Sequence, residues 1–82
     1  MTNNEFREWL RGFFELSEDN IVLDPRQIQV IVNHLNLAEA VETRLDDVNS
    51  QLRADIEAFR NQPSREAADF ERITQSMRDL VL

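Results

Sequence analysis

Apolar residues recur at intervals of three and four along most of the chain, the spacing of one face of an α-helix. No segment alternates apolar and polar residues long enough to indicate a β-strand. With one glycine and two prolines among 82 residues, positions that break a helix are few. The pattern predicts one all-α domain, residues 1–82, with short N-terminal helices over 1–35 and a helical hairpin over 36–82.

The first helix is expected from about residue 3 to residue 17. Thr2 and Glu5 have the spacing of a capping box, which satisfies two backbone donors at a helix start. Gly12 costs up to about 1 kcal/mol relative to alanine inside a helix, so close approach of another backbone is expected there. The acidic residues 18–20 are expected to end the helix as a loop. One side carries an apolar stripe: Phe6, Trp9, Leu10, Phe13 and Leu16, with Phe14 beside it.

A second helix is expected to begin at Pro25. Asp24 suits the N-cap, proline suits the first helical position, and Gln27 completes a variant of the capping box. His34 lies beside the apolar face of this helix and is interpreted as a half-buried packing residue. The apolar face itself consists of Ile28, Ile31, Val32 and Leu35, with Val30 to the side.

A long amphipathic helix is expected over residues 37–60, although Asn36 and Glu39 leave open whether the chain breaks at Asn36. Apolar residues from 38 to 52 follow the 3, 4, 3, 4 spacing of a coiled-coil seam. A break around Pro63 predicts a last helix over about 64–80, antiparallel to the long one.

Helix lengths then predict self-association into an oligomeric helical bundle. At 1.5 Å per residue the long helix measures about 36 Å and the last helix about 25 Å. The hairpin mate therefore leaves apolar surface uncovered, and large exposed apolar patches are uncommon on monomers. The residues expected at the interface with another copy or a partner are Trp9, Phe13, Phe14, Leu45, Val48, Leu52, Ile56 and Phe59.

The charge pattern limits the possible functions. The net charge is −7, and all nine basic residues are arginine, so direct binding to nucleic acid is not expected. Without cysteine, and with His34 alone, the chain predicts no metal site and no cofactor. No nucleophile, base and orienting acid form a recognisable set, so no catalytic residue is assigned and no enzyme is expected. No segment has the length and apolarity of a membrane span, which predicts a cytoplasmic protein with no membrane contact.

Two alternatives remain open beside protein–protein contact. In the first alternative, the protein is an oligomeric sponge that binds a signalling nucleotide. Arginines at a subunit junction then form its anion site. That site comprises Arg26, Arg44, Arg53 and Arg60. In the second alternative, spaced carboxylates imitate DNA phosphates and occupy the basic groove of a DNA-binding protein.

The N-terminal half resembles small uncharacterised proteins of tailed bacteriophages and prophages. Trp9-Leu10-Arg11-Gly12-Phe13-Phe14-Glu15-Leu16 matches their "WLxGFFEL" opening, and Ile31-Val32-Asn33-His34-Leu35 matches their "IxxHL" stretch. The resemblance covers roughly residues 5–38. It implies a phage-encoded accessory or structural protein in the bacterial host cytoplasm or associated with the virion. The leading hypothesis is therefore a homo-oligomeric, non-enzymatic phage protein that assists virion assembly or inhibits a host protein.

Overall fold

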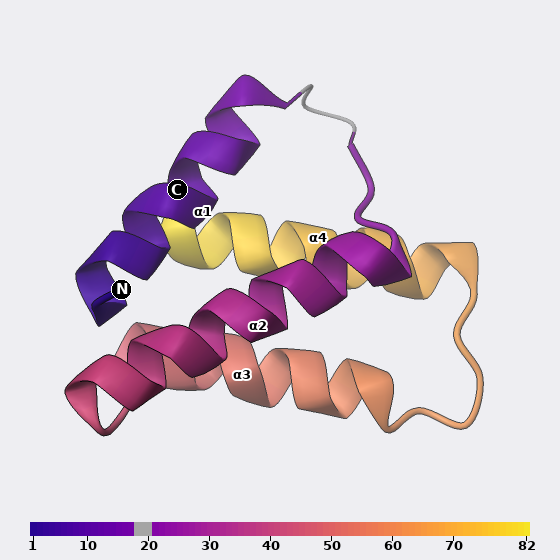
Figure 1. Ribbon diagram of the computed structural model, residues 1–82. Helices are drawn as coiled ribbons and strands as arrows, with labels where there is room; N and C mark the ends of the chain where they lie inside the picture. Colours follow the sequence, from indigo (N-terminus) through magenta and orange to yellow (C-terminus); the bar gives the residue numbers. More distant parts are fainter. Residues whose placement is uncertain (18–20) are drawn as a thin grey trace.

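The computed structural model describes residues 1–17 and 21–82, and the regular structure of these residues is entirely α-helical. The predicted all-α fold is confirmed, and the loop expected at residues 18–20 lies outside the described residues. Each helix packs on the next, and the last returns to contact the first (Figure 1). The four helices are α1 (Asn3–Leu16), α2 (Pro25–Glu42), α3 (Asp47–Arg60) and α4 (Ala67–Val81).

The predicted helix starts are confirmed by their caps. The Thr2 hydroxyl accepts from the Glu5 backbone N–H at 3.1 Å, and the Glu5 carboxylate accepts from the Thr2 N–H at 2.8 Å. Asp24 and Gln27 make the same reciprocal pair, at 2.8 and 3.0 Å. Each cap satisfies backbone donors that the helix itself leaves without a partner. The backbone approach expected at Gly12 of α1 is absent, because a Cβ built on Gly12 meets no atom of the described residues within 4 Å, its own helix backbone and chain neighbours apart.

The prediction of one long helix over residues 37–60 is wrong. The chain continues as a helix through Asn36 to Glu42 and then turns, so that α3 runs back antiparallel to α2 (Figure 1). Thr43 ends α2 in the left-handed conformation, with φ 66°. Asp46 caps α3 by accepting from the Asn49 N–H at 3.0 Å. The coiled-coil spacing from 38 to 52 therefore spans a turn and is not a continuous seam.

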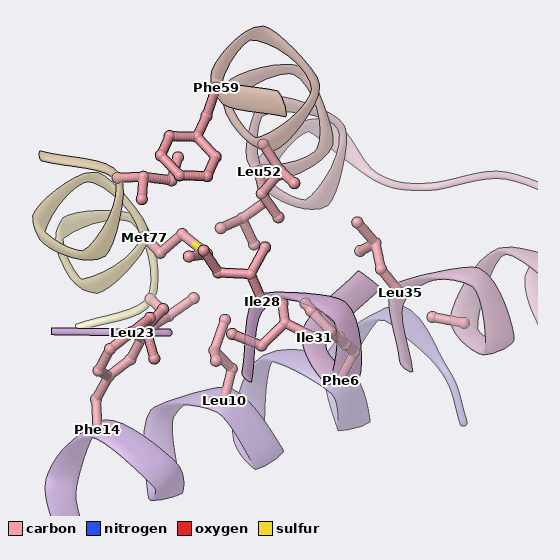
Figure 2. Packing of buried hydrophobic residues seen from close by; sticks show 14 residues of the cluster. Phe6, Leu10, Phe14, Leu23, Ile28, Ile31, Leu35, Leu52, Phe59 and Met77 are labelled. Atoms are coloured by element: carbon pink, nitrogen blue, oxygen red, sulfur yellow. The ribbon is translucent and has the colours of Figure 1, made fainter. Parts of the chain in front are cut away.

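The core draws on all four helices and on the α1–α2 connector (Figure 2). Leu23 of the connector is buried, and its N–H donates to the Thr74 hydroxyl of α4 at 3.0 Å. The helices supply the rest of the buried cluster: Phe6, Leu10, Phe14, Ile28, Ile31, Leu35, Ala38, Leu52, Ile56, Phe59, Ile73, Met77 and Val81.

A polar cluster fixes the start of α1 against the start of α3. Asn49, fully buried, donates through Nδ2 to the Asn3 side-chain oxygen at 2.8 Å and to the Asn3 carbonyl at 3.2 Å. Asn3 donates in turn to the Arg44 carbonyl at 3.1 Å and accepts from the Asp46 N–H at 3.2 Å. The guanidinium of Arg7 pairs with the Asp46 carboxylate. These contacts hold α1 across the turn between α2 and α3.

Candidate functional site

Helix α2 carries two apolar stripes. The first consists of Ile28, Ile31, Leu35 and Ala38 and lies in the core. The second follows the spacing 4, 3, 4 through Val30, His34, Leu37 and Val41. Of these, Val30 is 39% exposed, Leu37 55% and Val41 57%. A helix that is apolar on two faces is usually covered on both, yet the described residues leave the second stripe largely exposed at Leu37 and Val41.

Helix α1 contributes a neighbouring apolar strip. Trp9, Phe13 and Leu16 are separated by four and three residues and therefore share a side of the helix. Trp9 and Phe13 are half-buried and pack against the edge of the core. Leu16 is 92% exposed. The strip thus passes from the core edge to open solvent.

The two strips meet where Trp9 stacks on His34. The ring centroids are 4.2 Å apart, and the planes differ by 6°. His34 Nδ1 lies 2.8 Å from the Val30 carbonyl, which fixes the ring against its own helix. His34 is half-buried, in agreement with the packing role expected for it. The α1–α2 apolar face is defined here as Trp9, Phe13, Leu16, Val30, Leu37 and Val41.

The structure places the predicted interface residues in three groups. Trp9 and Phe13 lie in the α1–α2 apolar face. Leu45 and Val48 are half-buried at the α2–α3 turn and the first turn of α3. The remaining four are at most 8% exposed and form the core of the single chain, so they offer no surface to a partner: Phe14, Leu52, Ile56 and Phe59. Their assignment to an interface is corrected, because the seam from which it was inferred does not exist.

Three of the four predicted anion-binding arginines lie along the α2–α3 groove. Arg53 and Arg60 line one hollow of about 360 Å³, and Arg44 and Arg53 line another of the same size. Arg26 lines neither. Arg53 pairs with the Glu39 carboxylate at 2.8 Å and donates to the Asn36 side chain at 2.6 Å.

Carboxylates occupy the same groove. Glu57 lines both hollows, and Glu39 lines the second. Arg60 donates to the Gln29 side chain, and its carbonyl accepts from Arg65 at 2.8 Å. Because the positive charge is offset by neighbouring carboxylates, the geometry favours no anion site.

Two carboxyl groups have shifted pKa values, and both belong to helix caps. Burial opposes ionisation of Asp46, but the Asn49 N–H and the Arg7 guanidinium outweigh it, so the pKa of Asp46 lies below its usual 3.8. The Thr2 backbone and hydroxyl lower the pKa of Glu5. These shifts mark structural contacts at the ends of α1 and α3 and not acid–base chemistry.

Sequence reasoning missed the outer stripe of α2. The sequence pattern puts Val30 to the side of the apolar face, Leu37 and Val41 in the long helix, and Leu16 in the apolar stripe of the first helix. The signal was available, since the spacing 30, 34, 37, 41 runs beside the core spacing 28, 31, 35, 38. Two interleaved stripes on one helix indicate that both of its faces pack.

Two kinds of feature were sought among the described residues, a metal-holding cluster and a membrane-spanning helix. Over 1–17 and 21–82, no group of three or more His, Asp or Glu side chains is placed to hold a metal ion. None of the four helices is long and apolar enough to cross a membrane. The sequence matches no protein-family model, no curated protein and no solved structure. The α1–α2 apolar face is therefore the feature from which a function is inferred.

Proposed function

We propose that this chain is a non-enzymatic interaction protein that forms a homo-oligomer through the α1–α2 apolar face. The observation that carries the proposal is the second apolar stripe of α2, exposed at Val30, Leu37 and Val41. Stripes with this spacing bury against another helix in most helical assemblies. Trp9 of α1 contacts the stripe at His34, where the two rings stack.

The exposed area is large enough to drive association. The face has four aliphatic residues, whose exposed fractions are 92% for Leu16, 39% for Val30, 55% for Leu37 and 57% for Val41. At about 1.5–3 kcal/mol per fully buried side chain, their burial contributes roughly 4–7 kcal/mol per subunit. Two subunits supply about twice that amount, against an association cost of about 4–15 kcal/mol. Near the upper end of the burial range the gain exceeds the cost, so association is favourable.

The biological setting is part of the same proposal. The motif around Trp9 and Gly12 resembles small tailed-phage proteins, which supports a phage-encoded protein acting in the host cytoplasm or on the virion. The same motif supplies Trp9, Phe13 and Leu16 of the α1–α2 apolar face. In this setting the oligomer assists virion assembly or binds and inhibits a host protein.

A matched pair of variants tests the proposal. Leu37 in the face and Leu82 outside it are 55% and 56% exposed, so Leu37→Gln and Leu82→Gln remove equivalent apolar surface. Loss of Leu37 from both subunits should weaken a dimer by about 2 kcal/mol, or roughly 30-fold in Kd. Sedimentation velocity should show the Leu37 variant shifted toward monomer and the Leu82 variant unchanged. Equal behaviour of the two variants would contradict the assignment of the face.

A further inference from the structure

A hollow of about 510 Å³ lies at one end of the molecule, where α2 begins, α3 ends and α4 begins (Figure 1). All three helices and the segment between α3 and α4 contribute to its lining. None of its lining residues belongs to the α1–α2 apolar face. A ligand bound in this hollow is therefore separate from the contact that the proposed function requires.

The charge of this hollow is the reverse of the charge of the chain. The net charge of the chain is −7, and four other hollows among the described residues each include at least one carboxylate in their lining. Here the charged lining residues are Arg60 and Arg65, and no carboxylate of the described residues joins them. Neither arginine forms an ion pair within the described part of the chain. The balance of charge found in the α2–α3 groove is therefore absent at this end of the molecule.

Neutral partners hold both guanidinium groups in place. Arg60 donates to the side-chain oxygen of Gln29, and Arg65 donates to the Arg60 carbonyl at 2.8 Å. The guanidinium carbon of Arg65 lies 5.6 Å from the centre of the Phe59 ring, within the range of a cation–π contact. A guanidinium has more N–H donors than these contacts use. The remaining donors can bind a carboxylate or phosphate, whose oxygens match the planar fork of arginine.

The rest of the lining is apolar. Ile28 and Phe59 are buried, and Phe70 is half-buried. The rings of Phe59 and Phe70 meet edge to face, with centroids 4.9 Å apart and planes at 77°. Pro25 completes the apolar part. An apolar lining with a few convergent polar groups is typical of small-molecule sites, which measure about 300–1,000 Å³.

We propose that this hollow binds a small organic anion in which a carboxylate or phosphate is joined to an aromatic ring. The oxyanion pairs with Arg60 and Arg65, and the ring packs against Pro25 and Phe70. Both halves of the ligand are needed, since the apolar and the positive parts of the lining are adjacent. Of the four arginines predicted from the sequence to bind an anion, Arg60 lines this hollow.

Four simple compounds test the two halves of the ligand. Phenyl phosphate and phenylacetate carry the two candidate anionic groups on the same ring, whereas inorganic phosphate and benzyl alcohol each supply one half. A heteronuclear NMR titration of the isotope-labelled protein follows the backbone amides of Gln29, Phe59 and Phe70. At least one aromatic anion should bind with a Kd in the millimolar range, and each half alone about 10-fold more weakly or less. The tighter of the two aromatic anions identifies the anionic group.

Three arginine variants locate the site. Arg60→Gln and Arg65→Gln each remove a guanidinium from the hollow and should weaken binding of the tighter anion about 10-fold. Arg44→Gln removes the same charge from an exposed arginine that lines the α2–α3 groove instead, so its Kd should equal that of the wild type. Circular dichroism melting checks that each variant folds. Arg60 is exposed and bonds through its side chain to Gln29, so its replacement should leave the fold intact.

Three results would overturn the inference. The first is no shift of these amides with either aromatic anion up to about 10 mM, well above a millimolar Kd. The second is inorganic phosphate binding as tightly as phenyl phosphate and phenylacetate, which would indicate an adventitious ion only. The third is equal weakening by Arg44→Gln and Arg60→Gln, which would attribute binding to overall charge. Leu37→Gln, which tests the α1–α2 apolar face, should leave the Kd for the anion unchanged, so the two proposals fail separately.

Discussion

Asn49 is the residue whose replacement tests the architecture most severely. Its side chain is fully buried and joins α3 to the first residue of α1 through two hydrogen bonds to Asn3. Both bonds use the Nδ2 donor, whereas Asn49 Oδ1 has no partner among the described residues. The donor carries the interaction, so Asn49→Ala and Asn49→Asp should both be destabilising, and the aspartate more so at neutral pH.

The alanine variant sets the reference magnitude. It removes two hydrogen bonds of about 1 kcal/mol each and leaves the Asn3 carbonyl and side-chain oxygens with fewer donors. A small cavity adds to the cost, for a total of about 2–3 kcal/mol. For a domain of this size the melting temperature should fall by roughly 10–20 °C.

The aspartate variant keeps the volume of the side chain but replaces the Nδ2 donor with a second oxygen acceptor. Its carboxylate faces the two oxygens of Asn3 in a buried site, so the pKa of the introduced carboxyl should rise above its unfolded value of about 3.9. A raised folded pKa means that stability is retained below about pH 4 and lost as the pH rises through the folded pKa. At pH 7 the variant should therefore be less stable than Asn49→Ala.

Urea unfolding followed by circular dichroism at 222 nm, at pH 4 and pH 7, measures these differences. Linear extrapolation gives the free energy of unfolding of each variant. The reasoning is refuted if Asn49→Asp equals or exceeds Asn49→Ala in stability at pH 7, or if its deficit does not grow between pH 4 and pH 7.

Two further predictions concern the turn between α2 and α3. Thr43 adopts a left-handed conformation at φ 66° that costs a non-glycine residue about 1–2 kcal/mol, so Thr43→Gly should raise the melting temperature by several degrees; a lower melting temperature would contradict this. Asp46→Asn keeps a capping side chain but loses the charge paired with Arg7. Because the folded pKa of Asp46 is depressed, its contribution is present above about pH 4 and lost as the pH falls through the folded pKa. The variant should be less stable than wild type at pH 7 and equal to it near pH 2, as measured by urea unfolding; the same deficit at both pH values would argue against the ion pair.

Sequence alone predicted the elements that depend on local chemistry. The reciprocal caps at Thr2 and Asp24 involve residues three apart, and their interaction is settled by spacing. The break near Pro63 depends on proline in the same local way. These signals gave the start of α1, the start of α2 and the separation of α3 from α4.

The turn between α2 and α3 could not be found in the same manner. Residues 43–46 contain neither glycine nor proline, and Thr43 takes a conformation that β-branched residues rarely adopt. The tertiary contacts of Asn3 with Arg44 and Asp46 help to hold the turn. The helical spacing of apolar residues continues across the turn by coincidence. For this reason the sequence pattern predicts a single helix where the structure has two. A local signal was present in Asp46, which lies three residues before Asn49 and caps α3.

The candidate site was predicted in part. Trp9 and Phe13 are half-buried at the edge of the core, so part of each ring is accessible, and their contact with a partner stays a prediction. Phe14 was assigned to the same surface but lies in the core, since sequence position does not reveal which of two adjacent aromatics faces inward. The exposure of Leu16, Leu37 and Val41 depends on where neighbouring helices end, and that information is tertiary.

Self-association through the α1–α2 apolar face is the central claim, and the mass of the protein in solution tests it most directly. Light scattering on a sizing column, at two protein concentrations about tenfold apart, gives that mass without a label or a partner. The account predicts a mass above that of one 9.7 kDa chain, approaching two chains at the higher concentration. A mass of one chain at both concentrations would contradict it.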